Sequence, residues 1–144
     1  MISDAIARGI GTAGALKVAG LTYSTTAGVN VFTEALPQDP DVAVVVKSFG
    51  GGPPSSLLPY NEASLQILIR GDEDPGTALA LWDAIFAVLQ GAPKQTLPDG
   101  TILISCLVTQ GAPVNIGPDA NGRHRLSMNI NVEVVNFTAN RVEQ

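Results

Sequence analysis

The hydrophobic pattern is clearest in the middle of the chain, where alternation gives way to helical spacing. An alternating run predicts a strand with one covered face: Leu65, Gln66, Ile67, Ile69 and Arg70. After Gly71, Asp74 can cap a helix through its side-chain oxygen, and Pro75 fits the first helical position, where a missing N–H costs nothing. An apolar stripe at three- and four-residue spacing then leads to Gly91: Ala78, Leu81, Trp82, Ile85, Val88 and Leu89. We therefore expect a strand followed by a helix that covers the sheet.

The last third of the chain predicts two further strands. The first spans residues 101–110, and we expect one face of it to be covered: Ile102, Ile104, Cys106 and Val108. The second spans residues 125–134 and alternates as an antiparallel strand, with these residues inward: Leu126, Met128, Ile130, Val132 and Val134. Residues 111–122 join the two strands, and their glycines and prolines predict a long loop instead of a tight hairpin.

A helix is predicted at the N-terminus, from Ile2 to Leu16, with Ser3 as its cap and its end near Gly20. Three glycines each weaken that helix by up to about 1 kcal/mol relative to alanine: Gly9, Gly11 and Gly14. Either a neighbour packs closely against these glycines or the helix is irregular.

Two strands are predicted next, at residues 29–36 and 41–50, and the turn at residues 37–40 allows them to pair as a hairpin. Residues 50–58 are rich in Gly, Pro and Ser and lack periodicity, so we expect a flexible loop there. A flexible C-terminal tail is expected at residues 137–144.

Composition indicates one domain that hides part of its surface against other subunits. At 144 residues the chain can bury roughly 70% of the surface exposed by its unfolded form. Its charged residues are 15% of the total, against a typical value of about 25%, which favours contact with partners or with copies of itself. A net charge of −5 disfavours a basic nucleic-acid-binding face. The longest apolar run, residues 42–46, is too short to span a membrane, and we expect no membrane association.

Candidate catalytic and metal-binding chemistry is sparse. The acidic cluster of Asp72, Glu73 and Asp74 could hold a divalent cation, but carboxylates at a helix N-terminus also cap the helix and favour its dipole. His124 is the single histidine and lies between two arginines, which disfavour its protonated form. Cys106 is expected in the core, and one cysteine with one histidine cannot make a zinc site. We expect no catalytic residue, no metal and no cofactor.

Seven short segments in this order resemble the tail terminator proteins of long-tailed bacteriophages, some of which are described as minor capsid proteins. The resemblance covers about residues 59–135 and rests on these groups: Pro59-Tyr60-Asn61-Glu62; Leu65-Gln66-Ile67 with Arg70-Gly71; the Ala78, Leu81, Trp82, Ile85, Leu89 helix with Gly91; Gln110-Gly111-Ala112-Pro113; Gly117-Pro118-Asp119; Gly122-Arg123; and Ser127-Met128-Asn129-Ile130.

The resemblance implies an α+β fold: a single domain over residues 1–144, with a mixed, mainly antiparallel sheet and two helices on one face. It implies a ring, typically a hexamer, that ends growth of the tail tube and joins it to the head-completion or neck proteins. DNA would pass through the ring without specific binding. The expected place is the head-proximal end of the virion tail, after assembly in the host cytoplasm.

Two alternatives stay open. One is a neck connector or tail-tube protein of a phage. The other, from a different class, is a small hydrolase or metal-dependent enzyme that uses His124 or the acidic cluster at residues 72–74.

We expect the interface with neighbouring subunits and tail proteins in the loops, at one sheet end and in the tail. The candidate residues are Gly51, Pro53, Leu57, Leu58, Arg70, Ile116, Asp119, Arg123, His124, Phe137 and Arg141.

Overall fold

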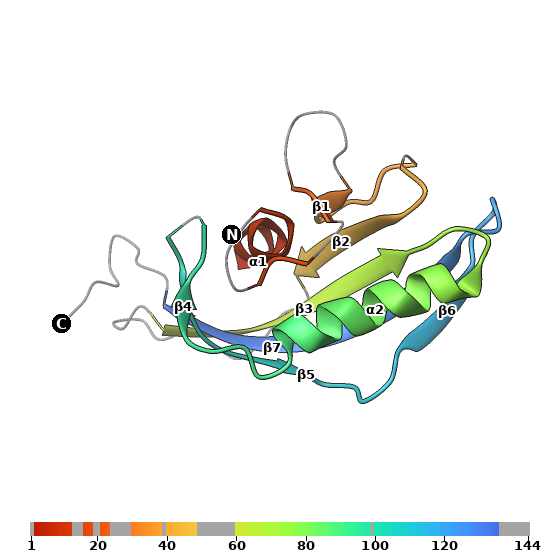
Figure 1. Ribbon diagram of the computed structural model, residues 1–144. Coiled ribbons are helices and arrows are strands. Elements are labelled where there is room, and N and C mark those ends of the chain that lie inside the picture. The colour runs from red at the N-terminus through yellow and green to blue at the C-terminus, as the bar shows by residue number, and fades with distance from the viewer. Residues whose placement is uncertain are drawn as a thin grey trace.

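A curled, mixed seven-stranded sheet carries two helices in the computed structural model, an α+β fold as expected (Figure 1). The structure describes residues 2–12, 16–18, 21–23, 30–38, 40–48, 60–98 and 100–135. The elements in chain order are α1 (Ile2–Gly11), β1 (Val31–Thr33), β2 (Ala43–Ser48), β3 (Tyr60–Arg70), α2 (Pro75–Leu89), β4 (Gln95–Thr96), β5 (Ile102–Val108), β6 (Val114–Pro118) and β7 (His124–Val135). The strand order is β1-β2-β3-β7-β5-β4, and β6 also pairs with β7.

The two long strands β3 and β7 form the centre of the sheet. They pair antiparallel over their whole common length, with Leu65 opposite Ile130 and Ile67 opposite Met128. These four side chains are at most 1% exposed, so the alternation predicted from the sequence is confirmed. A single core cluster contains them together with residues of both helices, which places α1 and α2 against this side of the sheet.

Helix α2 begins and ends as its sequence predicts. The N–H of Gly76 donates a 2.9 Å hydrogen bond to Asp74 Oδ1, and Pro75 is the first helical residue. Four residues of the predicted stripe are buried against the sheet: Ala78, Trp82, Ile85 and Leu89. After Gln90, Gly91 adopts a φ of 70°, a left-handed conformation that glycine takes without steric cost and that turns the chain away.

Helix α1 is shorter than predicted, because it ends at Gly11 and residues 16–18 are not helical. Ser3 lies inside the helix, so the prediction that it caps the helix is wrong. The close packing expected at the glycines is confirmed at Gly11, where an added Cβ would lie 2.5 Å from both the backbone nitrogen and the Cβ of Tyr23. Gly14 and Gly20 lie outside the described residues.

The predicted β1–β2 hairpin is wrong, because the two strands pair in parallel, with Val31 opposite Val44. The chain turns at Glu34, which adopts a φ of 68°. It then runs back to the end of the sheet at which β1 began, and β2 starts there. Thr22 closes the outer side of β1, since its carbonyl accepts hydrogen bonds from the N–H groups of Asn30 and Val31. A parallel pair needs this detour, whereas a tight turn would have made the strands antiparallel.

A register shift between Leu103 and Ser105 changes which residues of β5 face the core. Leu103 and Cys106 are fully buried, three positions apart, while Ile102 and Ile104 are half-buried. The prediction that Cys106 shares its face with Ile102 and Ile104 is therefore wrong, since an extra residue in a strand moves those before it to the other face.

A strand, β6, lies inside the predicted long loop. It pairs antiparallel with the start of β7, with Val114 opposite Ser127 and Pro118 opposite His124. β5 and β6 thus pair with the same side of β7, at its two ends. The predicted flexible segments, residues 50–58 and 137–144, lie outside the described residues. None of the helices in the described part of the chain is long and apolar enough to cross a membrane.

Candidate contact surfaces

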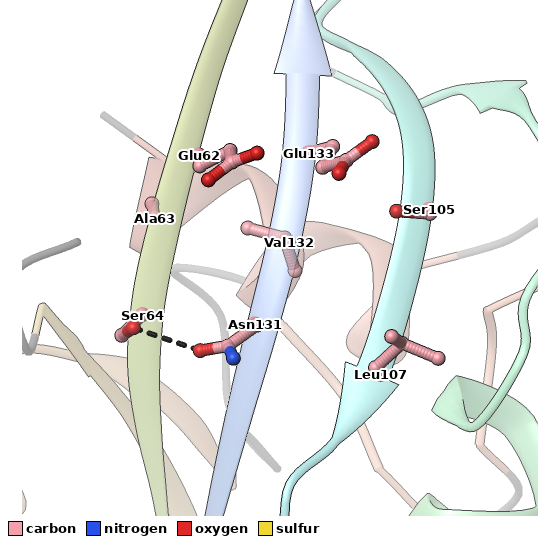
Figure 2. A pocket seen from close by; sticks show the side chains of 8 residues that line it. All are labelled: Glu62, Ala63, Ser64, Ser105, Leu107, Asn131, Val132 and Glu133. Carbon is pink, nitrogen blue, oxygen red and sulfur yellow. Dashed lines mark hydrogen bonds between the residues drawn. The ribbon is translucent and has the colours of Figure 1, made fainter. Parts of the chain in front are cut away.

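The polar side of the sheet is the first candidate contact surface. The residues that alternate with the core positions on β3, β5 and β7 point to this side, and Figure 2 shows several of them with helix ribbon behind the strands. A groove of about 520 Å³ runs across it, lined by Glu62, Ala63, Ser64, Ser105, Leu107, Asn131, Val132 and Glu133. An antiparallel sheet commonly has one such wet face, which leaves it available for contact with water or a partner.

Two carboxylates dominate the charge of this groove. Glu62 lies directly opposite Glu133 on the neighbouring strand, a like-charged pair that weakens strand pairing. Next to them, the Ser64 hydroxyl donates a 2.8 Å hydrogen bond to Asn131 Oδ1 (Figure 2). The eight lining residues include no lysine or arginine, so the groove is unsuited to holding a phosphate.

Arg70 and Arg123 meet at the other end of the sheet, where they hold the segment between β1 and β2. Arg70 Nε donates to the carbonyl of Asp41 at 2.9 Å, and its Nη2 donates to the carbonyl of Pro40 at 2.6 Å. Arg123 Nη1 donates to the Gln38 carbonyl at 2.6 Å. Three backbone carbonyls of one loop thus accept from two guanidinium groups, an arrangement that fixes the loop on the sheet.

Both arginines are candidate interface residues from the sequence, yet they are 4% and 5% exposed. Arg123 also donates from Nε to Asp119 Oδ2 at 2.8 Å and from Nη2 to Gln38 Oε1 at 3.0 Å. Their guanidinium groups are occupied within the chain, which leaves them little to offer a partner. Burial by a loop distant in sequence is not visible in local periodicity.

Asp119 is held by the turn before Arg123. Partial desolvation would raise the pKa of its carboxyl, but hydrogen bonds from the N–H groups of Arg123 and Asn121 and from the Arg123 side chain outweigh it, and the pKa is lowered. The carboxylate therefore stays ionised and organises the turn. His124 follows at the start of β7 and is half-buried. Its backbone N–H donates a hydrogen bond to the carbonyl of Asp72.

An acidic cleft of about 590 Å³ lies beside this turn, lined by Asp41, Asp72, Glu73, Asp74, Asn121 and Arg123. Two of its carboxylates serve the backbone: Asp74 caps α2, and Asp72 Oδ1 accepts from the Asp74 N–H at 2.9 Å. Arg123 Nη1 lies 3.3 Å from Asp41 Oδ1. Within the described residues no three His, Cys, Asp or Glu side chains are placed to share a metal ion. Asp41, Asp72 and Asp74 therefore each have a structural partner within the chain.

Cys106 lies in the core, fully buried, as the sequence predicts. Burial raises the pKa of its thiol to about 12, because the thiolate would be desolvated. The thiol therefore stays protonated at neutral pH and is a poor nucleophile.

Exposed apolar side chains mark the β5–β6 side of the molecule. Leu107, Val114 and Ile116 are 53%, 47% and 43% exposed, and Leu79 on α2 is 45% exposed. Ile116 is among the interface candidates from the sequence, whereas Leu107 and Val114 are not. The predicted alternation, with Cys106 and Val108 inward, already placed Leu107 on the opposite face of the strand. The other candidates, Gly51, Pro53, Leu57, Leu58, Phe137 and Arg141, lie outside the described residues.

The chain matches the family described as bacteriophage tail terminator protein over residues 7–136, which includes every strand and α2. No curated protein matches the chain.

Proposed function

The chain belongs to the bacteriophage tail terminator family, which gives it a structural role in the phage tail, and we propose that it forms the ring that ends tail-tube growth. The ring would contain six copies, sit at the head-proximal end of the tail, and join the tube to the head-completion or neck proteins. The family match, which extends over nearly the whole described fold, is the observation that carries this proposal.

Two surface features support self-association. Charged residues are 15% of the chain, and among the described residues three exposed large apolar side chains lie on the β5–β6 side: Leu107, Val114 and Ile116. Apolar side chains exposed on a subunit commonly lie in contacts between subunits.

The acidic groove supports a channel through which DNA passes without being held. Glu62 and Glu133 place two carboxylates on the polar side of the sheet, and none of the described residues that line the groove is a lysine or an arginine. If this side faces the channel, the groove repels phosphate groups. Replacing both carboxylates by lysine should then slow DNA ejection while leaving tail length unchanged, and an unchanged ejection rate would place this side away from the channel.

A phage that lacks this protein tests the main proposal. We expect electron micrographs to show tails of irregular length that are not joined to heads, with normal particles restored by the wild-type chain in trans. Tails of normal length that lie unjoined would instead indicate a neck connector, and a complete lack of tubes would indicate a tube protein.

The assembly itself is tested with purified protein. Native mass spectrometry in the presence of the major tail-tube protein should show a ring of six copies. A chain that stays monomeric under every assembly condition would contradict the proposal.

A further inference from the structure

Two strand edges in the described part of the sheet are closed. The outer side of β1 is covered by Thr22, whose carbonyl accepts from the N–H groups of Asn30 and Val31. The outer side of β5 pairs with β4 at one end and meets the end of α2 at the other, where Gly91 N–H donates to the carbonyl of Cys106 at 3.0 Å. Gln90 Oε1 then accepts from the N–H of Val108 at 2.7 Å.

Among the described residues, strand β6 is not closed in this way, and neither are the outermost strand β4 and residues 60–64 of β3, which lie beyond the end of β2. Within the described part of the chain β6 pairs with β7 on one side and with no strand on the other. In an antiparallel pair only every second residue turns its N–H and C=O toward the partner, so β6 turns the remaining groups outward. Four of its five residues are exposed, including Val114 and Ile116.

The segment around β6 lacks one common protection of an open edge, charged side chains. Proteins commonly guard open edges with lysine or other charges, because such edges pair with other chains. The segment from Leu107 to Pro118 contains no charged residue. Two features limit the length that can pair: Pro118 ends the strand, and the register shift between Asn115 and Gly117 bends it.

We propose that β6 is the subunit-joining edge of the ring: it adds a strand of a second copy to the sheet. This inference rests on the ring in the proposed function and names the contact that builds it. A second copy fits this edge because subunits of net charge −5 repel one another, and the uncharged segment from Leu107 to Pro118 brings no carboxylate to its side of the contact.

Ring closure also restricts what β6 can meet. Pairing of β6 with β6 would join two copies about a two-fold axis and use the same edge on both, leaving none for a third subunit. A ring needs a head-to-tail contact, so β6 must meet a different segment of the neighbour. Each subunit then contributes one β6 edge and accepts one from its other neighbour.

The test uses the full chain with a double substitution at the edge, Val114→Lys with Ile116→Lys. Both side chains are about half-exposed, so the fold should survive while two ammonium groups now guard the edge. Leu79→Lys is the matched control, because Leu79 is 45% exposed but lies on α2. Native mass spectrometry should show at least a tenfold loss of ring for the double variant and wild-type assembly for the control, with thermal unfolding of all three chains verifying the fold.

Hydrogen exchange gives a second readout that does not depend on the variants. In the wild-type chain, the amides of β6 that point away from β7 should exchange at least tenfold more slowly in the ring than in the free subunit. The inference is overturned if the ring forms and these amides are equally protected in both states, if they become protected only when tube protein binds, or if the double variant assembles normally. A stable dimer with protected β6 amides would indicate β6–β6 pairing and also overturn it. Failure of the wild-type chain to form any ring would overturn the proposed function as well. A ring that forms without using β6 would overturn only the present inference, so the two failures can be distinguished.

Discussion

The Ser3 hydroxyl donates a 2.7 Å hydrogen bond to Glu34 Oε1, which joins the first turn of α1 to the residue at which the chain leaves β1. The same oxygen accepts from the hydroxyl and the N–H of Ser48, at the end of β2, at 2.7 and 3.0 Å. One carboxylate therefore ties together a helix and two parallel strands. Glu34 also has a positive φ of 68°, an uncommon conformation for a residue with a side chain, and these bonds hold it there.

The stability of the fold should depend on pH through Glu34. Hydrogen bonds from Ser3, and then from Ser48, lower the pKa of its carboxyl below the ordinary value of 4.5. Because the folded pKa lies below the unfolded one, the stabilisation is present above pH 4.5 and is lost as the pH falls through the folded value. Urea unfolding at pH 7 and pH 3 should show a smaller loss for Glu34→Gln than for wild type. In a Ser3→Ala, Ser48→Ala background the same substitution should have less effect, and an equal effect in both backgrounds would contradict this role.

Arg123→Ala should destabilise the chain by about 2 kcal/mol, since it removes charge-assisted hydrogen bonds from a buried site. The Gln38 carbonyl and Asp119 Oδ2 lose donors at 2.6 and 2.8 Å. Arg123→Lys should recover only part of this, because an ammonium group cannot reach several acceptors in a fork. Arg125→Lys is the control: its contacts to the carbonyls of Gly117 and Pro118 are longer, at 3.3 and 3.4 Å, so chemical denaturation should show a small change. Similar losses of stability for the Arg123 and Arg125 variants would contradict the proposed role of Arg123 in holding the segment between β1 and β2.

Gly11→Ala should destabilise the chain by about 1–3 kcal/mol through overpacking, although alanine is the better helix former. The new Cβ would lie 2.5 Å from the backbone nitrogen of Tyr23, which is not a flexible group. Gly111→Ala is the comparison, because an added Cβ there meets no atom within 4 Å. Thermal unfolding of both variants should show a clear loss for the first and a change within about 0.5 kcal/mol for the second. A more stable Gly11→Ala variant would mean that the contact relaxes.

Cys106 should be unreactive in the native state, because burial raises the pKa of its thiol to about 12 and blocks access. A thiol-reactive dye should label the folded chain at least a hundredfold more slowly than the urea-unfolded chain. A second thiol provides the control: Ser105→Cys, combined with Cys106→Ala, places the group beside the polar groove, where labelling should be fast. Fast labelling of native Cys106 would show that the core opens there.

Two surfaces that the described residues leave uncovered bear on assembly: the polar groove and the outer edge of β6. The groove lies on the polar side of β3, β5 and β7, whereas the edge lies along β6. A ring can therefore use the edge for contact between copies while the groove stays uncovered. The fixed loop at Arg70 and Arg123 gives the sheet end beside β6 a rigid shape, which a repeated contact between identical subunits requires.

The sequence by itself determined the features that depend on neighbouring residues. The alternation in β3 and β7, the Asp74 cap, the stripe of α2 and the buried Cys106 follow from spacing and side-chain chemistry over a few residues, and the structure confirms each. The family resemblance stated from residues 59–135 is likewise confirmed by the match over residues 7–136.

Tertiary structure alone decided the features that depend on residues distant in sequence. The parallel pairing of β1 with β2, the strand character of residues 114–118 and the burial of Arg70 and Arg123 all result from contacts across the fold. The register shift in β5 likewise depends on its pairing with β7. Local patterns cannot specify these outcomes, because which side of a strand is covered, and which strand it meets, is set by the free energy of packing the whole sheet.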